Sequence, residues 1–219
     1  MGDSHRKVAV ITGAGKGMGR SIARTLADSV STIIVNDLDG DAATETAKEI
    51  SNFTDAVAVT QIGDVSDQSF VTNMFGRITE KFGGSDILVN NAGVLRPTNI
   101  ENISLEEWDF VVNGNLTTTF LCSKAVIPFM KKRGWGRIIN ISSSAGKNVS
   151  TIGGPHYTAA KAGILGFTRH MAKVLAEYGI TVNAICPGLI DTDMVRSTIS
   201  RERTSVYAAS FPMKRLGKT

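Results

Sequence analysis

Six short apolar runs, separated by longer stretches with a helical pattern, constrain the fold of this chain most strongly. Strand-like runs cover residues 7–12, 32–37, 56–61, 86–91, 136–142 and 179–185, and helical patterns cover 17–29, about 40–51, about 67–82, 104–133 and the segment around Tyr157. Strands that are apolar along their whole length and alternate with helices are typical of a parallel sheet covered on both faces. We therefore expect an α/β fold with a doubly wound, Rossmann-type sheet in the strand order 3-2-1-4-5-6.

Length and composition restrict the class of protein. The 219 residues are 42% hydrophobic and 20% charged, and they contain no repeat or linker, so they fit one domain. No stretch could span a bilayer, and the N-terminal apolar run is too short for a signal peptide. Cys122 and Cys186 are far apart and lack metal-ligand spacing, which is typical of buried thiols in a reducing compartment. The sequence predicts a single cytoplasmic domain over residues 1–219, without a metal site or a membrane partner.

The basic residues restrict the possible binding partners only weakly. The net charge is +4, and part of the excess gathers at 131–137 and 214–218. A nucleic-acid groove needs a broader basic face with exposed aromatic rings, so we expect no nucleic-acid partner. The two clusters indicate solvated charge, with binding of an acidic or phosphorylated substrate carrier as the alternative.

A glycine-rich turn, TGAGKGMGR, follows the first strand-like run directly. The pattern G-x-G-x-x-G does not fit it, but G-x-x-x-G-x-G does, with Gly13, Gly17 and Gly19. Glycines between a strand and a helix allow the backbone to approach a pyrophosphate, which then lies at the N-terminus of the helix. The turn therefore predicts a phosphate loop for a dinucleotide.

Charged residues near this turn bear on the choice of dinucleotide. Asp37 ends the second strand-like run, where an acid accepts hydrogen bonds from the adenosine ribose and repels a 2′-phosphate. Asp39 lies in the next turn and competes with Asp37 for this assignment, but its position also suits a structural role as the cap of the following helix. Lys16 favours the opposite choice, because a cation beside the loop suits a 2′-phosphate. We expect NAD(H) as the preferred cofactor, with NADP(H) as the alternative.

A tyrosine and a lysine stand four positions apart in PHYTAAKAG. On a helix, Tyr157 and Lys161 lie one above the other on the same face. Two readings are open at this point: a catalytic pair, or two amphipathic side chains on a helix surface.

Five motifs in this order resemble the short-chain dehydrogenases/reductases, especially the 3-oxoacyl-[acyl-carrier-protein] reductase-like members. They are TGAGKGMG, NNAG at 90–93, IINISS at 138–143, YTAAK at 157–161 and a stretch that ends in ICPG at 185–188. The resemblance covers residues 7–219, and it implies an oxidoreductase that transfers hydride from or to a nicotinamide cofactor.

The resemblance implies a catalytic role for four residues. Tyr157 is the general acid that protonates the substrate carbonyl, and Lys161 favours its phenolate form and holds the nicotinamide ribose. Ser143 hydrogen-bonds the carbonyl oxygen, although counting back from the tyrosine selects Ser144 instead. Asn115 helps a water chain to reach the lysine, with Asn113 as the nearby alternative.

The resemblance also implies a cofactor site spread along the chain. Its residues are Gly13, Lys16, Gly17, Met18, Gly19, Asp37, Leu38, Asp64, Val65, Asn91, Ala92, Gly93, Tyr157, Lys161, Pro187, Gly188, Ile190 and Thr192.

The sequence departs from the family pattern in two places. Family members continue beyond RLGK with a helix and a seventh strand, so we expect a truncated sheet with the sixth strand at its edge and a substrate lid at 189–215. Family members that act on acyl carrier protein often carry a basic residue where Tyr178 stands, and the cluster Lys131, Lys132 and Arg133 is the alternative patch for that partner. The resemblance implies a homotetramer or a homodimer.

These observations predict an NAD(P)-dependent oxidoreductase that interconverts a ketone and a secondary alcohol. The first expected substrate is a 3-oxoacyl thioester of acyl carrier protein or coenzyme A, in fatty acid metabolism. The alternatives are an NAD-dependent dehydrogenase of a small, cyclic, sugar or steroid alcohol, and a nucleotide-binding protein without catalysis.

Overall fold

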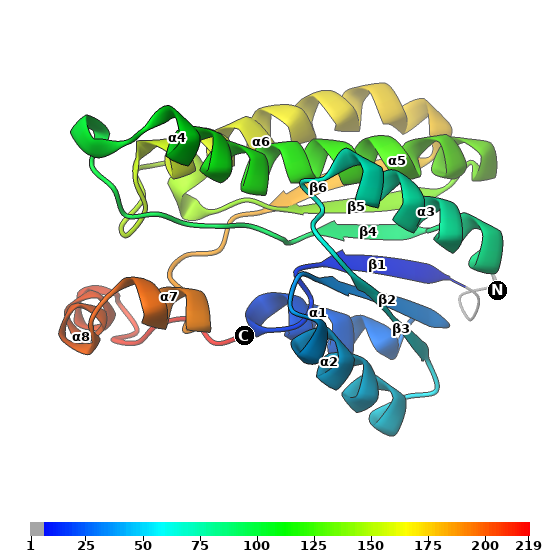
Figure 1. The fold of residues 1–219 in the computed structure, drawn as a ribbon, viewed down its shortest axis with the longest axis horizontal. Helices are drawn as coiled ribbons and strands as arrows, with labels where there is room; N and C mark the ends of the chain where they lie inside the picture. The colour runs from blue at the N-terminus through cyan, green and yellow to red at the C-terminus, as the bar shows by residue number, and fades with distance from the viewer. Residues whose placement is uncertain (1–6) are drawn as a thin grey trace.

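A parallel sheet between two layers of helices forms the body of the molecule (Figure 1). The computed structural model describes residues 7–219. The strands are β1 (Val8–Thr12), β2 (Thr32–Asp37), β3 (Val57–Ile62), β4 (Ile87–Asn90), β5 (Gly136–Ile141) and β6 (Ile180–Ile185). They lie in the order β3-β2-β1-β4-β5-β6 with every pair parallel, which confirms the expected fold class and strand order. Residues 1–6, part of the segment considered for a signal peptide, lie outside the described residues.

The helices divide between the two faces of the sheet. α1 (Gly17–Ala27) and α2 (Gly40–Phe53) cover one face, and α3 (Gln68–Phe82), α5 (Thr118–Arg133) and α6 (Pro155–Leu175) cover the other (Figure 1). α4 (Leu105–Val112) precedes α5, and α7 (Asp193–Thr198) and α8 (Arg201–Ser210) lie beyond the carboxyl ends of the strands. No helix within residues 7–219 is long and apolar enough to cross a membrane.

Each layer of helices has its own core. Met74 of α3, Leu88 of β4 and Met130 of α5 are fully buried on one face, and Ile11 of β1 and Ile50 of α2 are buried on the other. The sheet is thus apolar on both sides, as parallel strands require. Packing of the two helical layers fixes the carboxyl ends of the strands, where the connecting turns meet.

The expected helix over 104–133 is not a regular α-helix, which corrects the sequence-based prediction. A π-helical segment, Asn113–Thr117, separates α4 from α5. Thr118 and Thr119 each donate a hydroxyl hydrogen bond of 2.9 Å to the carbonyl of Asn115, so side chains share the backbone acceptor there. Such π-bulges are common at functional sites.

A chain of buried polar side chains crosses the helical layer of α5 and α6. The amide of Asn90 donates to Asn140 at 2.8 Å and to Ser123 at 3.1 Å, and Asn140 donates to Thr168 at 2.9 Å. These four side chains join β4, β5, α5 and α6. Because buried polar groups without partners are costly, the chain also restricts how α5 and α6 can seat on the sheet.

β6 lies at one edge of the sheet, as expected. Its residues Thr181, Asn183 and Ile185 are exposed, whereas Ile180 and Val182 are buried.

We predict that Asn140→Ala lowers the free energy of unfolding by about 2 kcal/mol, because it removes the buried acceptor of the Asn90 amide and the buried donor to the Thr168 hydroxyl. Asn183→Ala on β6 is the matched control: its side chain is exposed, so we expect a change within about 0.5 kcal/mol. Urea unfolding of the two variants measures both values, and equal losses would contradict a structural role for the buried chain.

Candidate active site

The glycine-rich turn forms a tight loop between β1 and α1. Gly13 and Gly17 have φ angles of +61° and +54°, which side chains other than hydrogen rarely permit. A Cβ atom at Gly19 would overlap the carbonyl oxygen of Gly13. Lys16 is the N-cap of α1 and makes no side-chain cap, so the first N–H groups of the helix have no capping acceptor. This cradle fits a pyrophosphate at the helix N-terminus.

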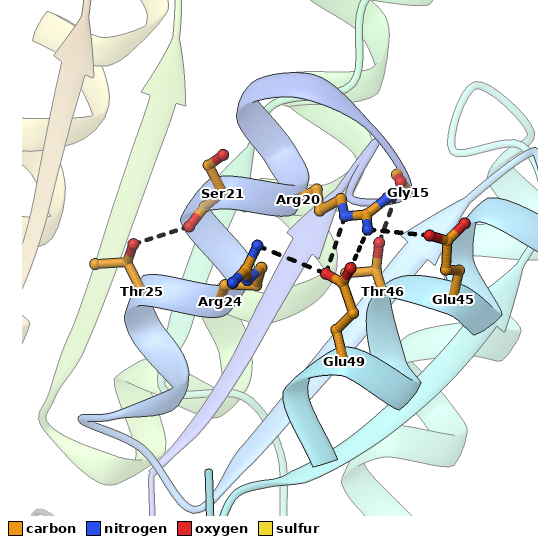
Figure 2. A network of polar contacts seen from close by, with 8 residues as sticks. All are labelled: Gly15, Arg20, Ser21, Arg24, Thr25, Glu45, Thr46 and Glu49. Atoms are coloured by element: carbon orange, nitrogen blue, oxygen red, sulfur yellow. Dashed lines mark hydrogen bonds and ion pairs between the residues drawn. The ribbon is translucent and has the colours of Figure 1, made fainter. Parts of the chain in front are cut away.

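The second βα unit holds the loop in place. The N–H of Gly15 donates to Asp37 Oδ2 at 2.7 Å, and the hydroxyl of Thr46 donates to the carbonyl of Gly15 at 3.1 Å. Figure 2 shows the latter bond beside a network in which Arg20 of α1 pairs with Glu45 and Glu49 of α2. Both backbone groups of Gly15 are therefore fixed by β2 and α2.

The expected adenosine end lies where β2 and β3 end. Asp37 stands at the end of β2, Leu38 is 71% exposed, and Asp64 is exposed in the turn after β3. Val65 and Met18 differ from the rest, because their side chains pack into the two cores.

The turn after β4 connects the loop to the catalytic helix. Thr12 Oγ accepts the N–H groups of Asn91 and Ala92 at 3.0 Å each, and the Asn91 amide donates to the carbonyls of Thr12 and Gly13 at 3.0 and 2.9 Å. Gly93 then allows close approach, since a Cβ there would lie 2.7 Å from Asn115 Oδ1 and 3.5 Å from Lys161 Nζ.

The three adjacent serines have different surroundings in the structure. Ser142 is buried and donates to the carbonyl of Lys161 at 2.8 Å, which fixes the helix backbone. Ser143 faces Tyr157 and lowers the pKa of its phenol by hydrogen bonding, although burial raises that pKa by more. Ser144 is exposed in the short Ser144–Gly146 turn. The geometry therefore favours Ser143 over Ser144.

The structure places Lys161 near Tyr157, with its ammonium bound to a backbone carbonyl. Its side chain is 4% exposed, and Nζ donates to the carbonyl of Ile141 at 2.9 Å while lying 5.6 Å from the Tyr157 ring centroid. Burial lowers the pKa of Lys161 to about 8. The role of this ammonium in favouring the phenolate of Tyr157 stays a prediction.

Asn115 is fully buried in the π-helical segment. Its amide donates to the carbonyls of Val94 and Val111 at 2.8 Å each. Within residues 7–219 no donor reaches its Oδ1, which faces Gly93 on the side of Lys161. A water hydrogen-bonded to this oxygen fits the expected role. Asn113, the alternative, is exposed and accepts from Thr117 at 2.9 Å, away from the site.

The segment after β6 passes beside the phosphate loop. Thr192 caps α7, and its methyl group would lie 3.4 Å from a Cβ at Gly17. Pro187 accepts the N–H of Ser144 at 2.8 Å, and Gly188 is exposed. Ile190 forms an isolated parallel bridge with Gly217.

Several residues of the site were not found from the sequence. A third apolar cluster of Leu95, Ile152, Val195, Ile199 and Leu216 packs beside Tyr157. The buried His156 pairs with Glu107 at 3.1 Å and ties α6 to α4. These residues come from separate loops and helices, so no local pattern in the sequence identifies them.

Comparisons with known proteins agree with this geometry. The family model for short chain dehydrogenase matches residues 7–203. The chain is 41% identical to the D-beta-hydroxybutyrate dehydrogenase of Rhizobium meliloti, over 88% of this chain and 75% of the relative. It is 40% identical to the 3-oxoacyl-[acyl-carrier-protein] reductase of Vibrio cholerae, over 96% and 84%. Among solved structures, a 3-oxoacyl-[acyl-carrier protein] reductase with bound NAD from Brucella melitensis has a TM-score of 0.88 at 34% identity, over 98% and 80%.

We predict that the buried Lys161 makes stability depend on pH in a defined window. The folded-state pKa of about 8 lies below the ordinary value of 10.5, so the unfolded chain binds more protons between these values. The free energy of unfolding should therefore rise with pH in this range, by up to about 1.4 kcal/mol per pH unit from this group. The raised pKa of Tyr157 acts in the opposite direction at higher pH.

Urea unfolding of the wild type and of Lys161→Met between pH 8 and 9.5 isolates this contribution. The variant removes the titrating group and retains an unbranched apolar stem. We expect the wild type to gain stability relative to the variant as pH rises, and parallel curves would refute the assignment.

Proposed function

The chain belongs to the short-chain dehydrogenase family and is an oxidoreductase that uses a nicotinamide cofactor; from that premise we propose that it interconverts 3-oxoacyl and 3-hydroxyacyl thioesters. The observation that carries the proposal is the half-buried Tyr157, which hydrogen-bonds with Ser143 and packs beside the third apolar cluster. The names of both curated relatives denote an oxygen on the third carbon of an acyl chain. An apolar wall beside the acid suits such a chain.

We propose the following roles for the site residues during reduction. The cofactor, when bound, supplies the hydride to the carbonyl carbon. Tyr157 donates its phenolic proton to the carbonyl oxygen, and Ser143 donates a hydrogen bond to the same oxygen as negative charge develops there. Lys161 and a water on Asn115 Oδ1 return a proton to Tyr157. The lowered pKa of Lys161 supports this role, because an amine whose pKa lies near neutral pH can both release and accept a proton.

We propose NAD(H) as the preferred cofactor and Asp37 as the residue that selects it. Its carboxylate lies at the end of β2 and is oriented by the N–H groups of Gly15 and Asp39, at 2.7 and 3.0 Å. A carboxylate fixed in this position accepts ribose hydroxyls and repels a 2′-phosphate. NADP(H) remains the alternative, through Lys16. We propose that the other cofactor-binding residues are those that the family resemblance implies. We also propose that residues 189–215 form the substrate lid.

The same site also suits a second reaction. Asp37 and the similarity to a D-beta-hydroxybutyrate dehydrogenase favour the oxidation of a small 3-hydroxy acid with NAD as the second candidate.

An acyl carrier protein is the proposed carrier of the thioester. Arg133 pairs with the buried carboxylate of Asp86 at 2.6 Å, and Lys131 lies 4.0 Å from the centroid of the Tyr178 ring. Tyr178 stands where such family members often carry a basic residue, and its ring instead contacts the ammonium of Lys131. Lys132 completes an exposed basic patch that suits an acidic partner. The oligomeric state and the cytoplasmic location stay predictions.

Tyr157→Phe tests the main proposal, since it removes the proton donor and keeps the ring that packs against the lid. With acetoacetyl-CoA, a short 3-oxoacyl thioester, we expect the wild type to oxidise NADH faster than NADPH. We expect the variant to lose at least about 100-fold in kcat. Its increase in Tm with NADH should match that of the wild type, which separates lost chemistry from lost binding. Undiminished turnover in the variant would rule out this mechanism.

The same assay distinguishes the two candidate serines. Ser143→Ala should lower kcat by about 100-fold or more, because the hydrogen bond to the developing oxyanion is lost. Ser144→Ala removes an exposed hydroxyl and should leave kcat near the wild-type value. The reverse order would show that the serine was assigned to the wrong position.

A further inference from the structure

We propose that Asp39 is a specificity-determining residue: by holding Lys16, it denies the phosphate loop the cation that a 2′-phosphate requires. This inference rests on the proposed cofactor site and deepens its preference for NAD(H). It assigns to Asp39 a role beyond the helix cap that its position in the sequence indicates.

The contact between the two side chains is direct. Lys16 Nζ, in the phosphate loop, donates to Oδ2 of Asp39, the N-cap of α2, at 2.6 Å. This hydrogen bond is the main cause that raises the pKa of Lys16 and lowers that of Asp39, so both groups are charged at neutral pH. The side chains are 58% and 44% exposed, so a ligand can reach either group.

The two oxygens of Asp39 have different partners. Oδ1 accepts the N–H of Ala42 at 3.1 Å and caps α2, whereas Oδ2 binds Lys16. The cap fixes the carboxylate, and the carboxylate in turn holds the lysine. A capping residue needs only one acceptor oxygen, so the second oxygen is free to act on the cofactor site.

The backbone beside Lys16 is fixed. The preceding residue, Gly15, donates to Asp37 and accepts from Thr46, the second of these bonds being drawn in Figure 2, so only the lysine side chain can change position. Its surroundings are acidic as well, because Asp37 and Asp193 add to the negative potential that Asp39 creates there. A 2′-phosphate would meet three carboxylates and one cation that is already paired.

The second cation of the loop is paired in the same way. Arg20 binds Glu45 and Glu49 of α2, and Arg24 lies 3.7 Å from Glu49 (Figure 2). Helix α2 and its cap thus neutralise both cations of the segment TGAGKGMGR. Arg20 therefore cannot substitute for Lys16 as a phosphate ligand.

The test compares cofactor affinities in matched variants of the whole chain. Asp39→Asn retains an acceptor oxygen for the cap and removes the charge that holds Lys16. Asp41→Asn is the control, because it removes an exposed carboxylate from the first turn of the same helix that no contact joins to Lys16. Fluorescence titration gives the Kd of NADH and of NADPH for each variant, and Tm confirms folding.

We expect Asp39→Asn to lower the ratio of the NADPH Kd to the NADH Kd by about three- to fivefold, the range that an exposed ion pair allows. Asp41→Asn should leave the ratio near its wild-type value. Adding Lys16→Gln to Asp39→Asn should cancel the gain, since the released cation is then absent.

Three results would overturn the proposal: an unchanged ratio in folded Asp39→Asn, an equal gain in Asp41→Asn, or a gain that survives Lys16→Gln. The wild-type ratio tests the NAD preference separately. A wild type that prefers NADPH would refute that preference, while the change caused by Asp39→Asn would still report on Asp39.

Discussion

The join between β1 and β4 at their carboxyl ends is the constraint on which the rest of the site depends. Thr12 and Gly13 on one side, and Asn91 and Ala92 on the other, share four hydrogen bonds. This is the point where the strand order reverses, so connections leave the sheet in opposite directions and a crevice forms between them. The bonds fix the phosphate loop relative to the turn that faces Lys161. Cofactor site and catalytic helix are therefore positioned by one short piece of backbone.

Lys161 is buried and is surrounded by polar groups of neighbouring segments. Lys161 is held by the carbonyl of Ile141, its own carbonyl is held by Ser142, and Asn115 approaches it only because residue 93 is glycine. The π-helical segment places Asn115 in this position and leaves its Oδ1 directed at the site. Lys161, whose pKa is lowered, therefore lies near Asn115 Oδ1, an acceptor that no donor within residues 7–219 reaches. A proton path requires groups of these two kinds close together.

The sequence predicts the fold class and the strand order correctly, because these depend on local spacing. Apolar runs define the strands, the glycines define the loop, and four residues of separation put Tyr157 and Lys161 on one face. Ser143 and Ser144 could not be separated by counting, since loop length shifts the register. The structure favours Ser143, because it hydrogen-bonds with Tyr157 while Ser144 is exposed. The π-helical segment, the direction of the Lys161 ammonium and the His156–Glu107 pair depend on packing between distant segments. No local pattern encodes them.

The third apolar cluster is separate from the two cores that flank the sheet, and this has a consequence for the dynamics of the chain. α7 and α8 contact the body through a few apolar side chains and through the hydrogen bond of Tyr207 to the carbonyl of Thr151, at 3.1 Å. Breaking these contacts leaves both cores and the sheet intact. The amides of α7 and α8 can therefore exchange with solvent through a local opening that needs less free energy than global unfolding. α7 and α8 therefore form a unit that can unfold separately from the sheet and its two cores.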